Sequence, residues 1–219
     1  MAKTNYPRIR LYGNDAIDSM PELVQDWYHA VGTPMGLGNF PWAKESVKKG
    51  VDVNARLDAY GGTALFLAIE QCNWAMVKYL VEEVKVDLEL VDYGGFNALD
   101  YAAACHQHHL DKPPVLQDGT LAPTDIASYL KSQGMAYTWF GAALAEDIDR
   151  LWEYLENGQD VNERGGHFNK NALEEAADNG GFWTARFLMV KGGISGTKLS
   201  QITMPEESEV CAAIQGKLK

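Results

Sequence analysis

Residues 51–80 read VDVNARLDAYGGTALFLAIEQCNWAMVKYL, and this stretch contains two short phrases that recur along the chain. The first phrase, VDVN at 51–54, returns as VDLE at 86–89 and as DVN at 160–162. The second phrase, TAL at 63–65, returns as NAL at 97–99 and again at 171–173. The two sets keep closely matched spacings, of 35 and 73 residues for the first phrase and of 34 and 74 for the second. Such spacing indicates internal repeats of about 35 residues.

The residues between the phrases follow helical periodicity. After Leu65, apolar side chains recur at Ala68 and Ile69, a polar break follows at 71–73, and apolar residues return from Trp74 onward at helical spacing. Residues 172–190 repeat this pattern before the glycine pair at 192–193. Each unit is therefore predicted to form two short helices joined by a tight turn, followed by an extended connector that contains glycine. One such pair cannot bury its own apolar face, so the units must stack.

Residues 146–162 (EDIDRLWEYLENGQDVN) and 45–54 (ESVKKGVDVN) look like a second helix that runs into the connector of an ankyrin repeat. The chain resembles the ankyrin-repeat family, whose period is about 33 residues. This resemblance implies an all-α fold, an ankyrin-repeat solenoid of stacked helix-turn-helix units with Gly-rich connector turns. We expect a single domain, 1–219, with about five repeats at 20–54, 55–87, 88–134, 136–162 and 163–194. An N-terminal segment, 1–19, is expected to precede the repeats, and a C-terminal tail, 195–219, is expected to cap them.

The chain departs from the family signature Thr-Pro-Leu-His in the first helices. The proline is alanine at 64, 98 and 172, and the histidine becomes Phe66, Asp100, Phe140 or Glu174. The third repeat is expected to hold an insertion, 106–123, between a first helix at 99–105 and a second at 124–133, because its prolines forbid a continuous helix. Only residues 134–136 are expected to separate that second helix from the next repeat, so one connector is missing.

Composition and charge restrict the possible functions. The chain has 19 Lys and Arg against 30 Asp and Glu, a formal net charge of −11, which argues against binding to nucleic acid or to an anionic membrane surface. It has no apolar run long enough to span a bilayer, no apolar secretory signal near residue 1, and three widely spaced cysteines. We therefore expect an intracellular, cytoplasmic protein. Neither dinucleotide-binding nor phosphate-loop glycine motifs occur, and we expect no cofactor.

The resemblance also implies where a partner would bind, because ankyrin stacks usually bind through the connector tips and the exposed positions of the first helices. By position, the expected partner-binding residues are Arg56, Asp58, Tyr60, Glu70, Asp92, Tyr93, Arg164, His167, Phe168 and Asp178. They would form an acidic, Tyr-bearing concave face for a protein partner, such as a basic peptide or a subunit of a larger assembly. The alternative is that each tyrosine packs on its neighbour's connector and stiffens the row.

A second functional hypothesis is an enzyme that uses acid–base chemistry. Asp100 and Glu174 would be partly buried acids near the irregular third repeat, and Tyr101, Trp139 and Phe140 would line a pocket for a small molecule. Isomerisation or cyclisation would fit such a site, since both need only acid–base help. The structural alternative is that both acids bond to backbone amides or hydroxyls of the adjacent repeat, because buried carboxylates are normally hydrogen-bonded. The first hypothesis, a non-catalytic scaffold or adaptor, is favoured.

One cluster, Cys105 to His109 followed by Asp111, carries side chains that ligate metals. Its spacing matches none of the paired patterns of zinc sites, and its histidines would need a further ligand from elsewhere. We expect a polar surface loop at this place, and no metal site.

Overall fold

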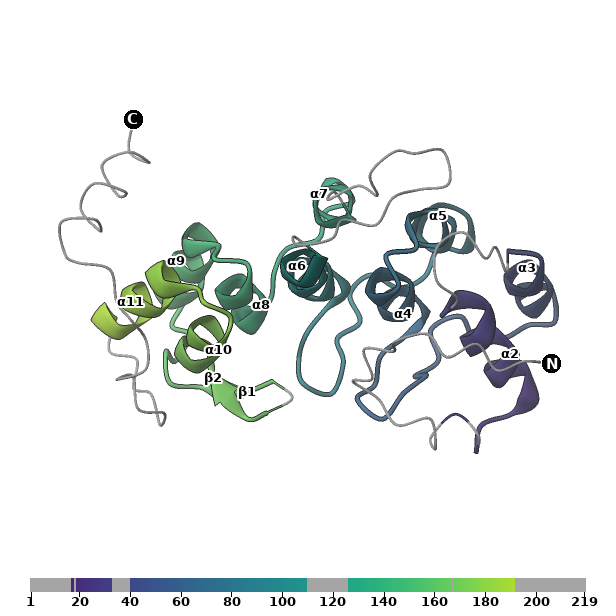
Figure 1. Cartoon of the computed structure of the whole chain (residues 1–219), viewed down its shortest axis with the longest axis horizontal. Helices are drawn as coiled ribbons and strands as arrows, with labels where there is room; N and C mark the ends of the chain where they lie inside the picture. Colours follow the sequence, from purple (N-terminus) through teal and green to yellow (C-terminus); the bar gives the residue numbers. More distant parts are fainter. Residues whose placement is uncertain (1–16, 18, 33–39, 110–125, 167, 192–219) are drawn as a thin grey trace. The chain divides into compact units, whose positions relative to one another are not determined.

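The computed structural model describes residues 17, 19–32, 40–109, 126–166 and 168–191 (Figure 1). Within these ranges the helices follow one another in pairs, and the only strands are short. The pairs are α2 (Glu22–Val31) with α3 (Phe40–Lys48), α4 (Ala64–Glu70) with α5 (Trp74–Lys78), α6 (Ala98–His109) with α7 (Ile126–Ser132), α8 (Trp139–Leu144) with α9 (Ile148–Glu156), and α10 (Ala172–Asp178) with α11 (Phe182–Val190). The predicted all-α repeat fold is confirmed.

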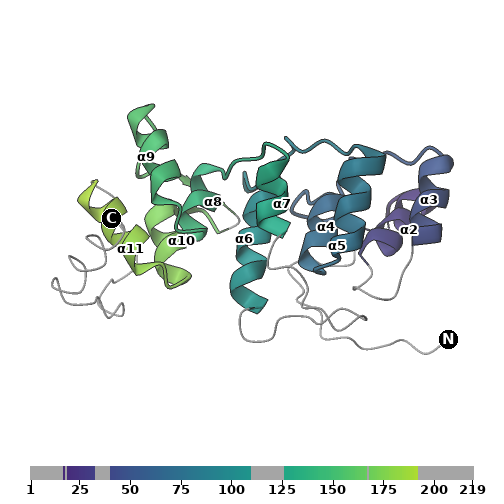
Figure 2. The ribbon, with the colours of Figure 1, turned by 90° about the horizontal axis from the view of Figure 1, so that it is seen from above.

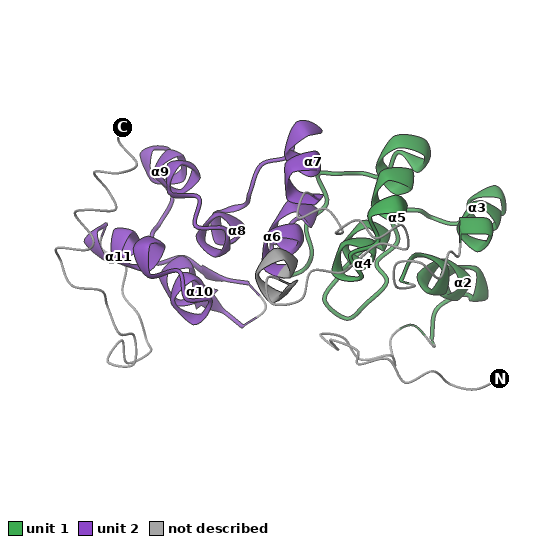
Figure 3. Ribbon diagram, turned by 45° about the horizontal axis from the view of Figure 1, so that its top comes forward, with its two compact units in different colours: residues 1–93, 114–123 green, residues 94–113, 124–219 purple. Residues whose placement is uncertain are grey.

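The chain divides into two compact units (Figure 3). Unit 1 comprises residues 1–93 and 114–123 and holds α2 to α5, and unit 2 comprises residues 94–113 and 124–219 and holds α6 to α11. Within each unit the two helices of a pair lie side by side (Figure 2). In unit 1, α2 also packs on α4, and in unit 2, α8 contacts both α6 and α10.

The first helices begin at polar caps, which explains the second repeated phrase. Asn97 accepts a hydrogen bond from the Asp100 amide at 3.0 Å, and Asn171 accepts one from the Glu174 amide at 2.9 Å. Thr138 caps α8 in the same way by accepting from Gly141. Such caps satisfy amides that have no partner within the helix and contribute about 0.5–2 kcal/mol each. The alanine and leucine that follow Asn97 and Asn171 enter the core.

The first repeated phrase is a turn closed by an aspartate. The Oδ1 atoms of Asp52, Asp87 and Asp160 each accept a hydrogen bond from the amide two residues later, at 2.9 to 3.0 Å. Aspartate favours this turn because its short side chain can reach its own backbone. The same local geometry at three places accounts for the spacing of the phrase. In unit 1 the turns are also linked, since the Asp87 amide donates to Asn54 Oδ1 at 3.0 Å.

Small and branched apolar residues of the first helices contribute to the core of each unit. Ala64, Leu65 and Ala68 are buried in unit 1, and Leu99 and Leu173 have no exposed surface in unit 2. Alanine at these positions lets neighbouring helices approach closely, while each fully buried leucine contributes about 1.5–3 kcal/mol of hydrophobic free energy.

The structure corrects the expected boundaries of the third repeat. Helix α6 continues to His109, four residues beyond the expected end at 105, because no glycine or proline interrupts it before Pro113. The expected insertion, 106–123, therefore begins inside a helix, and its remainder lies outside the described residues. Helix α7 falls within the expected range, and the link from α7 to α8, residues 133–138, is longer than the expected 134–136.

Two local features were not expected. Helix α5 continues directly into a π-helix, η1 (Tyr79–Val84), which ends at Lys85 in the left-handed conformation with φ of 61°. The last connector contains a small antiparallel pair of strands, β1 (Arg164–Gly165) and β2 (Lys170–Asn171). Within the described part of the chain, no helix combines the length and the apolar character that crossing a membrane requires.

Candidate functional site

An arginine joins two successive connectors in unit 1. Arg56 Nη1 donates hydrogen bonds to the carbonyl oxygens of Gly61 and Val91, both at 2.6 Å. The Tyr93 amide adds a third link by donating to the Tyr60 carbonyl at 2.7 Å. The Arg56 guanidinium carbon also lies 5.9 Å from the centre of the Tyr93 ring, within the range of cation–π attraction. These contacts hold the two connectors in a fixed relation.

The Tyr93 side chain is held in place although it is exposed. Its relative exposure is 73 %, yet its ring lies against the backbone of Gly61. Gly61 has φ of +82°, and a side chain added there would meet the ring at 3.0 Å, so glycine is needed for both reasons. The ring therefore packs on the neighbouring connector, as the stiffening interpretation expects, while most of its surface stays exposed; the partner-binding interpretation stays a prediction. Tyr60, the corresponding residue of the preceding connector, is half-buried.

The expectation that Asp58 and Asp92 are exposed is wrong. Both are buried, with relative exposures of 7 % and 4 %. Asp58 Oδ1 accepts hydrogen bonds from the amides of Tyr60 at 2.8 Å and Gly62 at 2.9 Å, so the carboxylate turns inward to close its own connector. Burial, with a smaller contribution from the charge of Asp92, raises the pKa of Asp58 above its usual value. Glu70, a third expected acid of this face, is half-buried.

The exposed groups that sequence reasoning missed lie on the same connectors. Val91 is 40 % exposed, and Asp52, Asp87 and Glu89 are exposed acids. The repeated phrase could have identified Asp52 and Asp87. In each, Oδ1 accepts a hydrogen bond only from the amide two residues later, and the side chain stays exposed to solvent. Unit 1 therefore presents an exposed aromatic and aliphatic pair, Tyr93 and Val91, on connectors that also carry exposed negative charge.

In unit 2 the expected residues gather on and beside the β1–β2 hairpin. Arg164 Nη2 lies 2.9 Å from Glu174 Oε2, and its Nε donates to the Asn169 carbonyl at 2.9 Å. Phe168 is 65 % exposed, with Lys170 Nζ 5.0 Å from the ring centre. Asp178 forms a 2.6 Å ion pair with the same lysine. His167, which was also expected to bind a partner, lies outside the described residues.

The candidate catalytic acid Asp100 is wholly buried and serves as a bridge between repeats. Its Oδ2 accepts hydrogen bonds from the Asn97 amide at 2.8 Å and from the Thr138 hydroxyl at 2.7 Å, and its Oδ1 accepts from the Thr138 amide at 3.1 Å. A side chain at Gly141 would overlap this carboxylate, so the site is filled. This geometry matches the structural alternative, in which the acid bonds to groups of the next repeat.

Glu174, the second candidate acid, is also engaged. Its Oε2 accepts from the Asn171 amide at 3.2 Å, which completes a reciprocal capping box, and it is the acid paired with Arg164. Tyr101 and Trp139 are buried, and the Trp139 ring meets Tyr154 edge-on at 5.9 Å between centres. Both aromatic side chains thus contribute to the core of unit 2.

No group of three or more His, Cys, Asp and Glu side chains among the described residues has the arrangement of a metal site. The side chains of Cys105 to His109 lie outside the described set, so the structure does not test that cluster. Cys72 carries a free thiol, and burial raises its pKa.

The comparisons with known proteins agree with this geometry. Residues 35–112 match a family model described as ankyrin repeats in three copies. Residues 35–112 carry ankyrin repeats. The matched segment covers α3 to α6, which includes both connectors of unit 1. The paired helices beyond it, α8 to α11, continue the same arrangement with the same caps and aspartate turns.

Two curated relatives match a stretch of 65 residues of this chain. They are NF-kappa-B inhibitor cactus of Drosophila yakuba and of Drosophila melanogaster, each 35 % identical over 65 residues. The alignment covers 29 % of this chain and only 13 % of the length of either cactus protein. The likeness is therefore confined to part of each molecule.

Proposed function

We propose that this ankyrin-repeat chain is a non-catalytic protein-interaction module, a scaffold or adaptor, that binds a protein partner through the connector tips of unit 1. The observation that carries the proposal is Tyr93: its ring is exposed, yet Arg56 and the backbone of Gly61 hold it in place. A rigid aromatic ring offers a partner a large contact area at little cost in conformational entropy. Val91, two residues earlier in the sequence, is a second exposed apolar side chain of this connector.

The exposed charge of these connectors favours a partner with basic side chains. Asp52, Asp87 and Glu89 are exposed, and the whole chain carries a formal net charge of −11. We infer a protein segment that places an apolar side chain on Tyr93 and basic residues near these acids. Long-range attraction of this kind raises the rate of association more than it lowers the rate of dissociation. The buried acids Asp58 and Asp92 are not part of this proposed surface.

Unit 2 offers a second contact region of the same kind at the β1–β2 hairpin. Phe168 is its exposed aromatic side chain, and Arg164 and Asp178 are its exposed charges. The two cactus relatives are named for the protein that they inhibit, which supports a protein partner for this chain as a class. The free thiol of Cys72 fits a reducing, intracellular compartment.

The test compares two exposed aromatic residues of unit 1. Tyr93 on a connector and Trp42 on α3 have relative exposures of 73 % and 60 %. The full chain is used to capture proteins from an extract of its source, one captured protein is purified, and its affinity is measured by titration. We expect Tyr93→Ala to weaken binding at least about 30-fold, as at interface hot spots of 2 kcal/mol or more, and Trp42→Ala to leave it unchanged. Equal affinities for both variants would refute the proposed surface.

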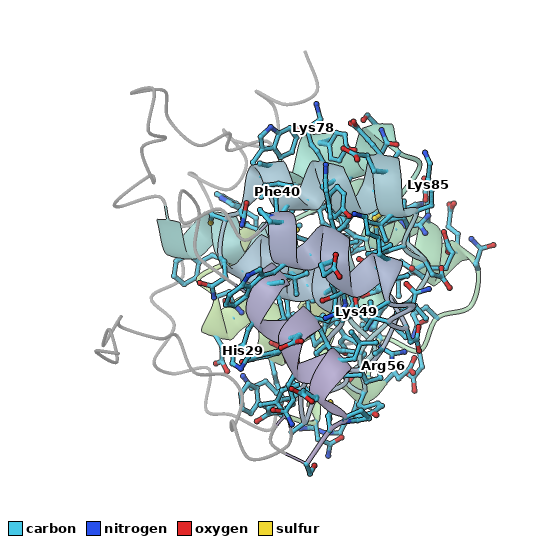
Figure 4. The ribbon with its side chains drawn as sticks, turned by 90° about the vertical axis from the view of Figure 1, so that its right-hand side faces the viewer. His29, Phe40, Lys49, Arg56, Lys78 and Lys85 are labelled. Carbon is cyan, nitrogen blue, oxygen red and sulfur yellow. The ribbon has the colours of Figure 1, made fainter. Side chains whose placement is uncertain are left out.

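A second matched pair tests the support of the ring. Figure 4 shows Arg56 at the connector edge of unit 1 and Lys78 at the opposite edge, on α5. Arg56→Ala removes the hydrogen bonds to Gly61 and Val91 and should weaken binding by loosening Tyr93. Lys78→Ala removes an equal charge and an exposed ion pair with Glu82, and it should leave binding unchanged. Loss of binding in both variants would show that the effect of Arg56→Ala is not specific to the support of Tyr93.

A further inference from the structure

Helix α11 is apolar around its whole circumference. Its sequence is FWTARFLMV, and Thr184, Ala185 and Leu188 are buried on the side that packs against α10. The remaining side chains are apolar as well, apart from Arg186. A helix that is hydrophobic all round is normally covered on all sides. Here, however, the outer side is open: Phe182, Met189 and Val190 have relative exposures of 36 %, 40 % and 76 %.

The apolar surface continues onto α9, the neighbouring second helix of unit 2. Trp152 is 43 % exposed, and its ring centre lies 6.1 Å from that of Phe187. Lys191 Nζ lies 3.8 Å from the centre of the Trp152 ring, so the edge of the surface is cationic. We call this surface the outer face of α11; it comprises Trp152, Phe182, Arg186, Phe187, Met189, Val190 and Lys191. Contiguous exposed apolar patches of this kind mark binding surfaces.

The chain that follows Lys191 contains a segment of matching character. Residues 205–217 read PEESEVCAAIQGK, a sequence that predicts a short helix with proline in its first turn. Val210, Ala213 and Ile214 share one face of that helix at helical spacing. The first turn contains Glu206, Glu207 and Glu209, which complement the positive charges of Arg186 and Lys191.

Residues 192–204, which join α11 to the segment 205–217, are long enough to let that segment reach the outer face of α11. Residues 192–204 can span up to about 45 Å when extended, at roughly 3.5 Å per residue, whereas α11 with its nine residues is only about 14 Å long. A tether of this length gives the segment an effective concentration at the face on the order of millimolar. A weak intrinsic affinity is therefore enough to keep the segment bound.

We propose that residues 205–217 dock as an amphipathic helix on the outer face of α11, with Val210 and Ile214 against Met189 and Val190. The acidic first turn of the segment lies toward Lys191 and Arg186. Docking removes exposed apolar surface from water and closes this side of unit 2, so that a second copy cannot pair with it. This inference is independent of the proposed function, which concerns the connectors.

Hydrogen–deuterium exchange of the full chain tests the docking. In the wild type, the amides of 206–216 should exchange at least tenfold more slowly than those of an unstructured peptide of the same sequence. Val210→Asp with Ile214→Asp should abolish this protection and speed exchange in α11. The matched control, Ser208→Asp with Gln215→Asp, adds the same charge on the opposite side of the predicted helix and should retain the protection.

A reciprocal pair of variants tests the other side of the contact. Val190→Asp should release residues 205–217, whereas Phe168→Asp, at another exposed apolar side chain on the β1–β2 hairpin, should not. Unstructured exchange rates of 206–216 in the wild type would overturn the proposal. It would also be overturned if light scattering showed a dimer that Val190→Asp dissociates without changing exchange in the tail, because a second copy would then cover the face.

Discussion

The hydroxyl of Thr138 donates a 2.7 Å hydrogen bond to the carboxylate of Asp100, 38 residues earlier in the chain. The bond joins the first helix of one repeat to the cap of the next, and the same hydroxyl accepts from the Gly141 amide. Each group therefore has a local role in its own helix and a second role between repeats. The structural alternative stated for Asp100, an acid bonded to groups of the adjacent repeat, is thus found in unit 2.

This relationship predicts a strong energetic coupling between the two residues. Asp100→Ala should lower the free energy of unfolding by about 2–4 kcal/mol, because buried amide and hydroxyl donors lose their acceptor. Thr138→Val should cost less, and the double variant should cost less than the sum, with a coupling of about 0.5–3 kcal/mol. Urea denaturation of the four proteins measures this cycle. Strict additivity would show that the carboxylate and the hydroxyl act independently.

Gly141→Ala should destabilise the chain, although glycine to alanine within a helix is normally favourable by about 0.5–1 kcal/mol. The reason is that the added methyl group would overlap the Asp100 carboxylate. Combining Gly141→Ala with Asp100→Ala should recover part of the loss, since the shorter side chain makes room. Thermal denaturation of the single and double variants provides the measurement, and a raised melting temperature for Gly141→Ala alone would contradict the packing described here.

The buried carboxylate of Asp58 predicts a specific dependence of stability on pH. Its pKa is raised above the usual 3.8 mainly by burial, so between pH 3.8 and the raised value the native chain holds a proton that the unfolded chain has released. Stability from this group therefore falls as the pH rises through that window and is constant above it. Asp58→Asn removes the titration while keeping an oxygen acceptor for Tyr60 and Gly62. Urea denaturation from pH 3.5 upward should show the free energy of unfolding of the wild type falling relative to that of the variant as the pH rises. A constant difference in free energy between the two proteins would exclude this effect.

The exposed acids of the connectors predict a kinetic effect on partner binding. Asp87→Asn with Glu89→Gln removes two charges, and the asparagine oxygen still closes the turn at the Glu89 amide. Association should slow and lose part of its salt dependence, while dissociation stays nearly constant. Glu82→Gln with Glu83→Gln, an equal charge change on η1, is the control. Surface plasmon resonance at two salt concentrations separates the rates, and identical slowing by both pairs would point to net charge rather than to the connectors.

The repeat pattern was predictable because its two phrases are local chemistry. Asp52, Asp87 and Asp160 each bond an amide two residues away, and Asn97 and Asn171 each cap the helix that they precede. Such bonds depend on neighbouring residues alone. The spacing of the phrases in the sequence is therefore enough to predict the repeat pattern of the fold.

The orientation of the connector acids was not predictable in the same way. Asp58 bonds the local amides of Tyr60 and Gly62 much as Asp52 bonds the amide two residues later, yet Asp58 is buried and Asp52 is exposed. This difference in burial depends on packing between residues that are distant in the sequence. The exposed position of Val91 likewise depends on Arg56, which bonds the Val91 carbonyl from 35 residues away. The contrast between Tyr60 and Tyr93 has the same origin, because identical Tyr-Gly-Gly motifs meet different neighbours.

The π-helical segment η1 has a consequence for how this chain tolerates changes in length. An extra residue in an ordinary helix would rotate everything after it by about 100° and turn core side chains toward water. A wide turn takes up one additional residue locally. Leu80 and Val81 remain inside while Glu82 and Glu83 stay outside, and the following aspartate turn keeps its place. We therefore expect the segment η1 to tolerate the insertion or deletion of one residue without a change of register in the helix before it or the aspartate turn after it.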